Sequence, residues 1–588
     1  MSVCREAIHH RPKSNLAYAE DGETVRLRLR AKKGNLDGCR VLHADKFDWG
    51  NRSLTRLEKV RSDSRFDYWE TSVTPAHRRL CYAFLLEADD EELWFTEWGF
   101  ESKAENDLPT AGTDQPLHYF EYPFVNPADV IDPPEWVADA VFYQIFPERF
   151  ANGNPDIDPD GVEDWGGKPE QDNFFGGDLQ GVIDNLDYLD DLGITALYLT
   201  PIFESTSNHK YNTTDYERID PHFGDKETLK RLVDAAHDRD MRVMLDAVFN
   251  HCGRRFGPFQ DVLENGRDSE YVDWFHIHEF PIQLEPRPSY DAFGFESYMP
   301  KLNTENPEVK SYLIDVATDW IEETGIDGWR LDVANEVDHE FWREFRRAVK
   351  DVKPDAYILG EIWHDSRPWL QGDQFDAVMN YPFTYAADDF LGEQSIDAST
   401  FADKVNRFLT RYPEQVNEVL FNLLGSHDTA RLKHRYDGDE RKVRLALLVL
   451  LTFRGTPCVY YGDEVGMTGG EDPDCRRTMV WDPDEQDRDL HRYVSDLVDL
   501  RTTHRPLRRG TLTFDRDQCR GDRVVYSRSE RDSTEKVTVG VNRGESPVEV
   551  RVPCDGTPET LVATTGEEIP RDGDSVFELP PMSGAVWK

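Results

Sequence analysis

Polar residues that could act together close several short apolar runs in the middle of the chain. The set comprises Asp246, Asn250 and His251 after one run, Arg330 and Asp332 after the next, Glu361 after a third, and His427 and Asp428 after a fourth. Any one of these residues is as readily explained as a satisfied polar group or a helix cap, because Asp is favoured at helix N-termini. Separate structural roles become improbable when four apolar runs all end in such residues, and the pattern indicates a common site.

The chemistry that suits this set is the cleavage of glycosidic bonds. One carboxylate of a pair acts as nucleophile and the other as acid/base, with the two carboxyls roughly 5–5.5 Å apart when the mechanism retains configuration. Crowded carboxyls raise one another's pKa, which keeps one of them protonated near neutral pH. The 14 Trp and 23 Tyr residues offer faces on which sugars stack. The sequence has no Ser–His–Asp arrangement, no phosphate-binding Gly loop followed by Lys, and no cysteine nucleophile.

The elements that must position these residues form a regular alternation. Eight β-rich apolar runs cover 140–147, 194–201, 242–250, 326–334, 356–362, 375–381, 419–428 and 456–464. Amphipathic stretches with helical spacing, such as 226–240 and 306–325, lie between them. This pattern predicts an α/β protein with a (β/α)₈ TIM barrel rather than an open doubly wound sheet. Because catalytic residues of such barrels lie at the carboxyl ends of the strands, we expect the polar set on one rim.

The flanking regions differ from the barrel. Residues 1–125 contain alternating runs at 24–32 and 78–88, which predict an N-terminal β-sandwich. The barrel is expected over 126–505, with an inserted, non-periodic loop domain at about 252–305 after the third strand. Residues 506–588 return to β-patterned runs at 523–529, 536–543 and 548–553, which predict a C-terminal β-sandwich.

The net charge restricts the partners. The chain of 588 residues carries 114 Asp and Glu against 68 Lys and Arg, a formal net charge of -46. Such a surface repels nucleic acid and anionic membranes and disfavours a negatively charged substrate, whereas a neutral sugar is unaffected. The acidic residues are spread along the chain, which is typical of a folded surface adapted to a halophilic, high-salt cytoplasm.

The N-terminal residues and the cysteines favour a cytoplasmic protein. Residues 1–21 contain no apolar core of signal-peptide length, and no later run is long enough to span a bilayer. The cysteines occur singly, without CxxC spacing, and are expected to be free thiols. They are Cys4, Cys39, Cys81, Cys252, Cys458, Cys475, Cys519 and Cys554.

Four motifs in order resemble the signature regions of the α-amylase superfamily. They are DAVFNH (246–251), GWRLDVANEV (328–337), GEIWHD (360–365) and LLGSHDT (423–429). MPKLN (299–303) and VANE (333–336) resemble the subgroup of cyclomaltodextrinases, neopullulanases and maltogenic amylases. The resemblance covers essentially the whole chain. It implies a retaining α-glucan hydrolase without an organic cofactor, an N-terminal domain of the glucan-binding or dimerisation type, and a homodimer.

The same resemblance implies a role for each site residue. Asp332 would be the nucleophile, Glu361 the acid/base and Asp428 the third carboxylate on the distorted sugar. Arg330 would keep Asp332 ionised by charge pairing, and Asp246 would support the floor of the site. The residues implied to bind substrate are His251, His427, Tyr211 in SNHKYNTTDY (207–216), and Asp472 and Arg476 in GGEDPDCRR (469–477).

Two further segments resemble a calcium loop of the subgroup. RFANGNPDID (149–158) and FFGGDL (174–179) would supply oxygen donors from Asn152, Asn154, Asp158, Gly176 and Asp178 to a structural Ca²⁺. Ile157 stands where the subgroup usually has Asn, so one side-chain donor is missing. The alternative for this region is a solvated acidic turn.

Other functions remain open at this point. A transglycosylase or an exo-acting α-glucosidase would use the same barrel, because sugar can replace water as acceptor. A trehalose-forming or branching enzyme is disfavoured by MPKLN. A non-catalytic sugar-binding barrel is disfavoured because all three carboxylates are present. The sequence does not choose among cyclodextrins, pullulan, starch and maltooligosaccharides.

Overall fold

The eight apolar runs each form a strand of one parallel sheet in the computed structural model. The strands are β11 (Phe142–Ile145), β12 (Ala196–Leu199), β15 (Arg242–Ala247), β16 (Gly328–Leu331), β17 (Tyr357–Gly360), β18 (Ala377–Val378), β19 (Phe421–Leu423) and β20 (Thr456–Tyr460). Their order is β18-β17-β16-β15-β12-β11-β20-β19. A parallel bridge between Met379 and Phe421 joins the two end strands, and the N–H of Asn380 donates to the carbonyl of Phe421 at 2.8 Å. The sheet therefore closes into the expected (β/α)₈ barrel.

The structure describes residues 2–89, 91–105, 118–530, 533–553, 558–571, 573 and 575–588. These residues form two compact units. The first contains 1–132, 370–373 and 396–417, and the second contains 133–369, 374–395 and 418–588. In the part of the chain that the structure describes, no helix is long and apolar enough to cross a membrane. Seven cysteines are free thiols, and Cys554 lies outside the described residues.

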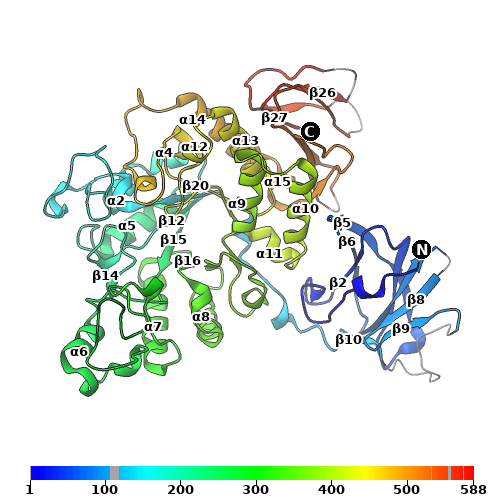
Figure 1. Cartoon of the computed structure of the whole chain (residues 1–588), viewed down its shortest axis with the longest axis horizontal. Coiled ribbons are helices and arrows are strands. Elements are labelled where there is room, and N and C mark those ends of the chain that lie inside the picture. Colours follow the sequence, from blue (N-terminus) through cyan, green and yellow to red (C-terminus); the bar gives the residue numbers. More distant parts are fainter. Residues whose placement is uncertain are drawn as a thin grey trace. The chain divides into compact units, whose positions relative to one another are not determined.

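Helices follow the strands and surround the barrel, as Figure 1 shows for α5, α7, α8, α9 and α13. Each long helix begins at a side chain that accepts from a free N–H of its first turn, as Asp225 does for Thr228 and Asp338 for Phe341. The helices are α1 (Glu135–Asp139), α2 (Pro147–Phe150), α3 (Leu179–Asp184), α4 (Leu186–Asp191), α5 (Lys226–His237), α6 (Gly257–Asn265), α7 (Pro307–Thr324), α8 (His339–Val352), α9 (Tyr381–Ala387), α10 (Ala398–Leu409), α11 (Glu414–Val419), α12 (Leu432–Arg435), α13 (Glu440–Thr452), α14 (Arg488–Thr503) and α15 (Arg505–Arg509).

Two excursions leave the barrel on the side of the polar rim. The antiparallel pair β13 (Phe203–Ser205) and β14 (Thr213–Ile219) follows β12 and brackets the loop that holds Tyr211. The segment 252–305 follows β15 but is not a loop throughout, since it contains α6 and three single-turn helices. The buried Phe259 and Val262 stand one helical turn apart on α6, which anchors the excursion to the core.

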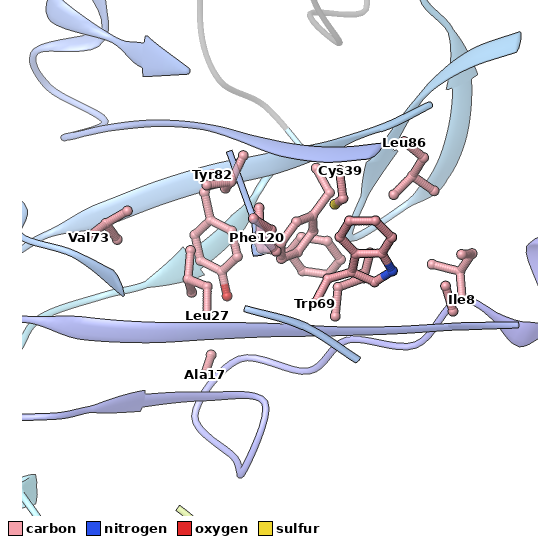
Figure 2. Packing of buried hydrophobic residues seen from close by; sticks show 14 of the residues in the cluster. Ile8, Ala17, Leu27, Cys39, Trp69, Val73, Tyr82, Leu86 and Phe120 are labelled. Atoms are coloured by element: carbon pink, nitrogen blue, oxygen red, sulfur yellow. The ribbon is translucent and has the colours of Figure 1, made fainter. Parts of the chain in front are cut away.

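The N-terminal region folds into two antiparallel sheets. One contains β1 (Ala17–Ala19), β2 (Val25–Lys32), β5 (Glu58–Ser62) and β6 (Phe66–Val73). The other contains β3 (Gly38–Ala44), β4 (Ser53–Arg56), β7 (Leu80–Ala88), β8 (Glu91–Thr96), β9 (Gly99–Ser102) and β10 (Phe120–Tyr122). Figure 2 shows Leu27 and Trp69 of the first sheet packed with Tyr82, Leu86 and Phe120 of the second. This packing between two sheets is that of a β-sandwich.

The C-terminal region is also rich in strands. A five-stranded sheet contains β21 (Thr511–Phe514), β22 (Arg523–Ser529), β23 (Lys536–Asn542), β25 (Thr560–Ala563) and β27 (Ser583–Trp587), and a second sheet pairs β24 (Val548–Arg551) with β26 (Val576–Leu579). Val525, Val550, Phe577 and Trp587 form part of one buried cluster that joins the two sheets. These strands belong to the same compact unit as the barrel.

Candidate functional site

The floor of the candidate site is one buried guanidinium that faces three carboxyls. Register places Asp246 of β15 beside Arg330 of β16, and Arg330 Nη1 donates to Asp246 Oδ2 at 3.0 Å and to Asp332 Oδ1 at 2.8 Å. Arg330 Nη2 lies 2.9 Å from Glu361 Oε2. One arginine therefore fixes carboxyls from three successive strand ends through both terminal nitrogens.

Two further donors orient the Glu361 carboxyl. The N–H of Val333 donates to Oε2 at 2.9 Å, and the indole N–H of Trp363 donates to Oε1 at 3.0 Å. Val333 has a left-handed backbone with φ of 45°, which is a strained conformation for a β-branched residue. This conformation turns the N–H that follows Asp332 towards Glu361. Trp363 in turn lies flat on Tyr381, with ring centroids 3.7 Å apart.

The pKa of Asp332 moves opposite to the expectation from charge pairing alone. Burial raises the pKa of Asp332 well above its ordinary value, and Arg330 only partly opposes this effect because it also serves Asp246 and Glu361. Burial likewise raises the pKa of Asp246 to about 6. The carboxyls around Arg330 therefore retain a proton at pH values where an isolated carboxyl would be ionised.

A chain of hydrogen bonds connects Tyr211 and His427 to this floor. Gln144 Nε2 lies 2.9 Å from His427 Nδ1, so the amide donates to Nδ1 and the ring proton resides on Nε2. His427 Nε2 lies 2.6 Å from the Tyr211 hydroxyl, which donates to Asp246 Oδ2 at 2.9 Å. Burial holds the pKa of His427 well below its ordinary value, so the ring is neutral. The rings of Tyr211 and His427 are nearly parallel, with centroids 5.3 Å apart.

Arg476 brings Asp428 and Asp472 to the opposite side of the site. Its Nη2 lies 3.5 Å from Asp428 Oδ1, and its Nη1 lies 3.0 Å from Asp472 Oδ1. Arg476 Nε donates to the carbonyl of His427 at 2.8 Å. Asp428 Oδ1 also lies 3.3 Å from His427 Nε2, so two neighbours hold Asp428 through this oxygen.

His251 presents a free donor to the site. Its Nδ1 is 3.2 Å from Asn250 Nδ2, while its Nε2 is buried with no hydrogen-bond partner among the described residues. The ring stacks on Phe293 with centroids 5.1 Å apart. Burial lowers the pKa of His251 to about 3, so the ring is a neutral donor. An unpartnered buried N–H of this kind is suited to a hydroxyl of a bound molecule.

These side chains surround one cavity of about 820 Å³. The sequence-predicted residues that line it are Tyr211, His251, Asp332, Glu361, Asp428, Asp472 and Arg476. Arg330 and His427 lie directly behind this wall, bonded to residues that form it. The sequence analysis missed Gln144, Trp363 and Phe293. Gln144 lies inside the first of the eight apolar runs (140–147), and a search for polar residues within the runs as well as at their ends would have found it.

The residues of the expected calcium loop lie together. Asn152 Nδ2 donates to Asp158 Oδ1 at 2.8 Å, and a side chain at Gly176 would collide with both residues. Asn152 Oδ1 is buried with no hydrogen-bond partner in the described ranges. Asp178 caps α3 and accepts from the N–H of Asn154 at 2.8 Å. The cluster thus offers oxygen donors of the kind that Ca²⁺ takes, although both Asp178 oxygens already accept backbone N–H groups.

The other metal-binding side chains form no comparable group. Over the residues that the structure describes, no cluster of three or more His, Cys, Asp and Glu side chains is arranged to hold a metal ion. Carboxyls, guanidinium groups and neutral histidines line the cavity or lie directly behind its wall. Such a set can transfer protons, form an ester at a carboxylate and bind hydroxyls.

Comparisons with known proteins agree on one family. The model described as "Alpha amylase, catalytic domain" matches residues 144–495, and that of "Alpha amylase, N-terminal ig-like domain" matches 1–126. The chain is 55% identical over 590 residues to a cyclomaltodextrinase of Geobacillus thermopakistaniensis (strain MAS1), covering 99% of each protein. It is 48% identical over 529 residues to an intracellular maltogenic amylase of Bacillus subtilis (strain 168), covering 89% of each. A solved cyclomaltodextrinase structure superposes with a TM-score of 0.91 at 49% identity, over 99% of this chain and 100% of that one.

Proposed function

This chain belongs to the α-amylase family, and from that premise we propose that it is a retaining hydrolase of α-1,4-glucosidic bonds in small or cyclic glucans. The observation that carries the proposal is the fork of Arg330, which holds Asp332 and Glu361 beside each other on the cavity wall. Two carboxyls that flank the scissile bond, one to attack the anomeric carbon and one to protonate the leaving oxygen, are what a double displacement requires.

In the first half of the reaction, Glu361 gives its proton to the glycosidic oxygen. Asp332 attacks the anomeric carbon as the bond to that oxygen breaks, so the leaving sugar departs with a hydroxyl and the other sugar remains as an ester of Asp332. Asp332 keeps its contact with Arg330 Nη1 at 2.8 Å, which favours the ionised nucleophile.

In the second half, Glu361 acts as a base. Its carboxylate takes a proton from water, and the water oxygen attacks the anomeric carbon and releases Asp332. Two inversions give net retention of configuration. The donors from Val333 and Trp363 hold the Glu361 carboxyl in one orientation through both steps, which limits the cost of reorganisation.

The remaining residues bind the sugar that is cleaved. Asp428 accepts hydrogen bonds from hydroxyls of the distorted ring in the transition state, and His251 donates a hydrogen bond from its Nε2, which has no partner among the described residues. Tyr211 forms an apolar wall on which the ring stacks, and its hydroxyl is fixed by His427 and Asp246. Asp472 and Arg476 contact the neighbouring sugar. Burial lowers the pKa values of His251 and His427, so both rings are uncharged when a sugar binds.

Initial rates on β-cyclodextrin, pullulan and soluble starch, measured at high and low salt, test the proposal. We expect the fastest cleavage with β-cyclodextrin and a loss of at least about 10³-fold with Asp332→Asn, because the amide cannot form the ester. Product analysis separates hydrolysis from transfer to sugar acceptors. Activity on none of the three glucans, or activity that survives the substitution, would show that the substrate class or the catalytic assignment is wrong.

Calcium is a separate part of the proposal. Asn152 through its unpartnered Oδ1, Asp158, Asp178, and the carbonyls at Asn154 and Gly176 would hold a structural Ca²⁺, which neutralises the two carboxylates and ties 152–158 to 176–178. We expect Ca²⁺ to raise the melting temperature and Asp158→Asn to abolish that rise, as measured by calorimetry. A melting temperature that does not respond to Ca²⁺ would favour the solvated acidic turn.

The cellular setting completes the proposal. A net charge of -46 and similarity to an intracellular maltogenic amylase support a cytoplasmic enzyme adapted to high salt. The homodimer that the resemblance implies is part of the same proposal. Light scattering in molar KCl measures the mass, and melting temperatures across a salt series measure the adaptation. A monomer at all protein concentrations, or full stability without salt, would contradict these two statements.

A further inference from the structure

Glu148 and Arg149 form a buried ion pair that the proposed reaction does not use. Both lie on α2, directly after β11, and are 2% and 1% exposed. The Arg149 Nη1 and Glu148 Oε2 atoms are in contact. Removing two charges from water is costly, so a pair of this kind at the polar rim of a barrel calls for a reason beyond packing.

Arg149 connects two segments that border the cavity. Its Nε donates to the carbonyl of Arg476 at 3.0 Å, and its Nη2 lies 3.2 Å from both the carbonyl and the side-chain oxygen of Asn173. The guanidinium also lies over the ring of Phe175, 4.7 Å from its centroid. One planar group thus links residue 476 to the segment 173–175.

The first of these segments fixes the third carboxylate. Arg476 contacts Asp428, Asp472 and the carbonyl of His427 through its three guanidinium nitrogens. A guanidinium can make these contacts together only if its own main chain is held in place. Arg149 donates directly to the main-chain carbonyl of Arg476. It therefore acts on Asp428 through Arg476, which contacts Asp428.

The second segment directly follows part of the cavity wall, since Gln171 and Asp172 line the cavity. Glu148 Oε1 accepts from the N–H groups of Phe175 and Gly176, the latter at 2.9 Å. Asn208 Nδ2 donates to the carbonyls of Gln171 and Asn173 at 2.9 Å each, and Gln171 and Asn208 line the cavity. Arg149 therefore holds the Asn173 end of the segment 173–176, and Glu148 holds the end at Phe175 and Gly176.

We propose that Glu148 and Arg149 are positioning residues that, through Arg476 and the segment 173–176, set the distance between the Asp428 side of the cavity and the wall at 171–172. The proposal rests on the proposed function, since it takes Asp428 as the transition-state contact. The planar guanidinium presents Nε to Arg476 and Nη2 to Asn173 at a fixed separation, whereas a lysine at this position has a single flexible nitrogen and cannot fix that separation. A displacement of about 1 Å at a catalytic group costs about 10²-fold in rate.

The test compares Arg149→Met, Arg149→Lys and Glu148→Gln with Arg528→Met as a matched control. Arg528 is also fully buried, and within the described residues it donates to the main-chain carbonyls of Gly510 and Thr452, far along the chain from the cavity residues. The kcat and KM values on β-cyclodextrin and the melting temperature are measured for every variant. Wild-type activity on β-cyclodextrin is the prior condition, and its absence would refute the proposed function instead of the positioning role.

For Arg149→Met we expect kcat to fall about 100-fold with KM changed less than about threefold, because the lost interaction is made in the transition state. Arg149→Lys should have a melting temperature close to that of the wild type but a kcat below about a tenth of the wild-type value. Glu148→Gln should have a kcat between those of the wild type and Arg149→Met. If Arg149→Met does not fold, Arg149→Lys alone tests the proposal: a wild-type melting temperature with a lowered kcat supports the positioning role. A kcat restored by lysine, or an equal loss of kcat in Arg528→Met, would show that the pair serves stability only.

Discussion

Glu464 provides a quantitative prediction, because it is a fully buried carboxyl outside the cavity. It follows β20, and its Oε1 accepts from the hydroxyls of Tyr143 at 2.9 Å and Tyr188 at 2.6 Å. Its Oε2 has no hydrogen-bond partner within the described ranges. Burial raises the pKa of Glu464 from 4.5 to about 7, against the hydrogen bonds from the two tyrosines. The ionised side chain is therefore costly to bury, and the protonated one is not.

The sign and size of the effect follow from linkage. The folded pKa exceeds the unfolded value, so the contribution of Glu464 to stability is fully present below pH 4.5 and is lost as pH rises through about 7. Each pKa unit corresponds to about 1.4 kcal/mol, so the loss is about 3 kcal/mol. Glu464→Gln removes this dependence while an oxygen remains to accept from Tyr143 and Tyr188.

Melting temperatures of wild type and Glu464→Gln between pH 5 and pH 8 give the assay. We expect the variant to gain about 2.5 kcal/mol relative to wild type across this interval, because part of the full loss has already occurred at pH 5, or about 2 °C at about 2.1 cal/mol/K of unfolding entropy per residue. The change of the difference with pH is decisive, because the amide adds an N–H that costs the same at all pH values. Glu485→Gln, at an exposed position, is the control. A difference that is constant from pH 5 to pH 8 would refute the reasoning.

Three further outcomes follow from the structure. Asp327 is buried, and its carboxylate contacts His237, Arg242, Lys353 and the N–H of Val243, so its pKa is lowered to about 2. Asp327→Asn should therefore lower the free energy of unfolding by about 2 kcal/mol at pH 7, and this difference should vanish as pH falls through about 2. Equal stabilities of variant and wild type at pH 7 would contradict this. Burial raises the pKa of Asp332 and of Asp428. The apparent pKa of the acid limb in a plot of kcat/KM against pH should therefore lie above the ordinary carboxyl value of about 4. An acid limb at or below that value would contradict this prediction. Tyr211→Phe should keep kcat/KM within about tenfold, since the ring remains, whereas Tyr211→Leu should lose about 100-fold; equal losses would show that the hydroxyl matters more than the ring.

The barrel could be predicted because its strands are buried on both sides. Each of the eight apolar runs is a strand, and the residues that close four of the runs meet around Arg330. Parallel strands place their carboxyl ends on one rim, so spacing along the chain was sufficient for Asp246, Asp332 and Glu361. The helix α6 was missed because it has only nine residues and a Gly and a Pro at its start, which suggest a loop.

Contacts between distant loops could not be predicted in this way. Tyr211 and His427 are 216 residues apart, and their hydrogen bond depends on the β13–β14 excursion as well as on the barrel. The raised pKa of Asp332 depends on burial and on the sharing of one guanidinium by three carboxyls. The sequence indicates which groups carry charge, whereas the solvent around each group is a property of the fold.

The assignment of Asp332 as nucleophile is tested most directly by trapping the glycosyl-enzyme. The Glu361→Gln variant, treated with α-maltosyl fluoride, should form an ester that breaks down slowly, because the fluoride leaves without an acid and no base remains to activate water. Digestion and mass spectrometry would then locate the sugar. The account predicts one maltosyl group on the peptide that contains Asp332, absent from the Asp332→Asn/Glu361→Gln double variant. A maltosyl group on any other residue, or turnover of the fluoride with inverted configuration, would contradict it.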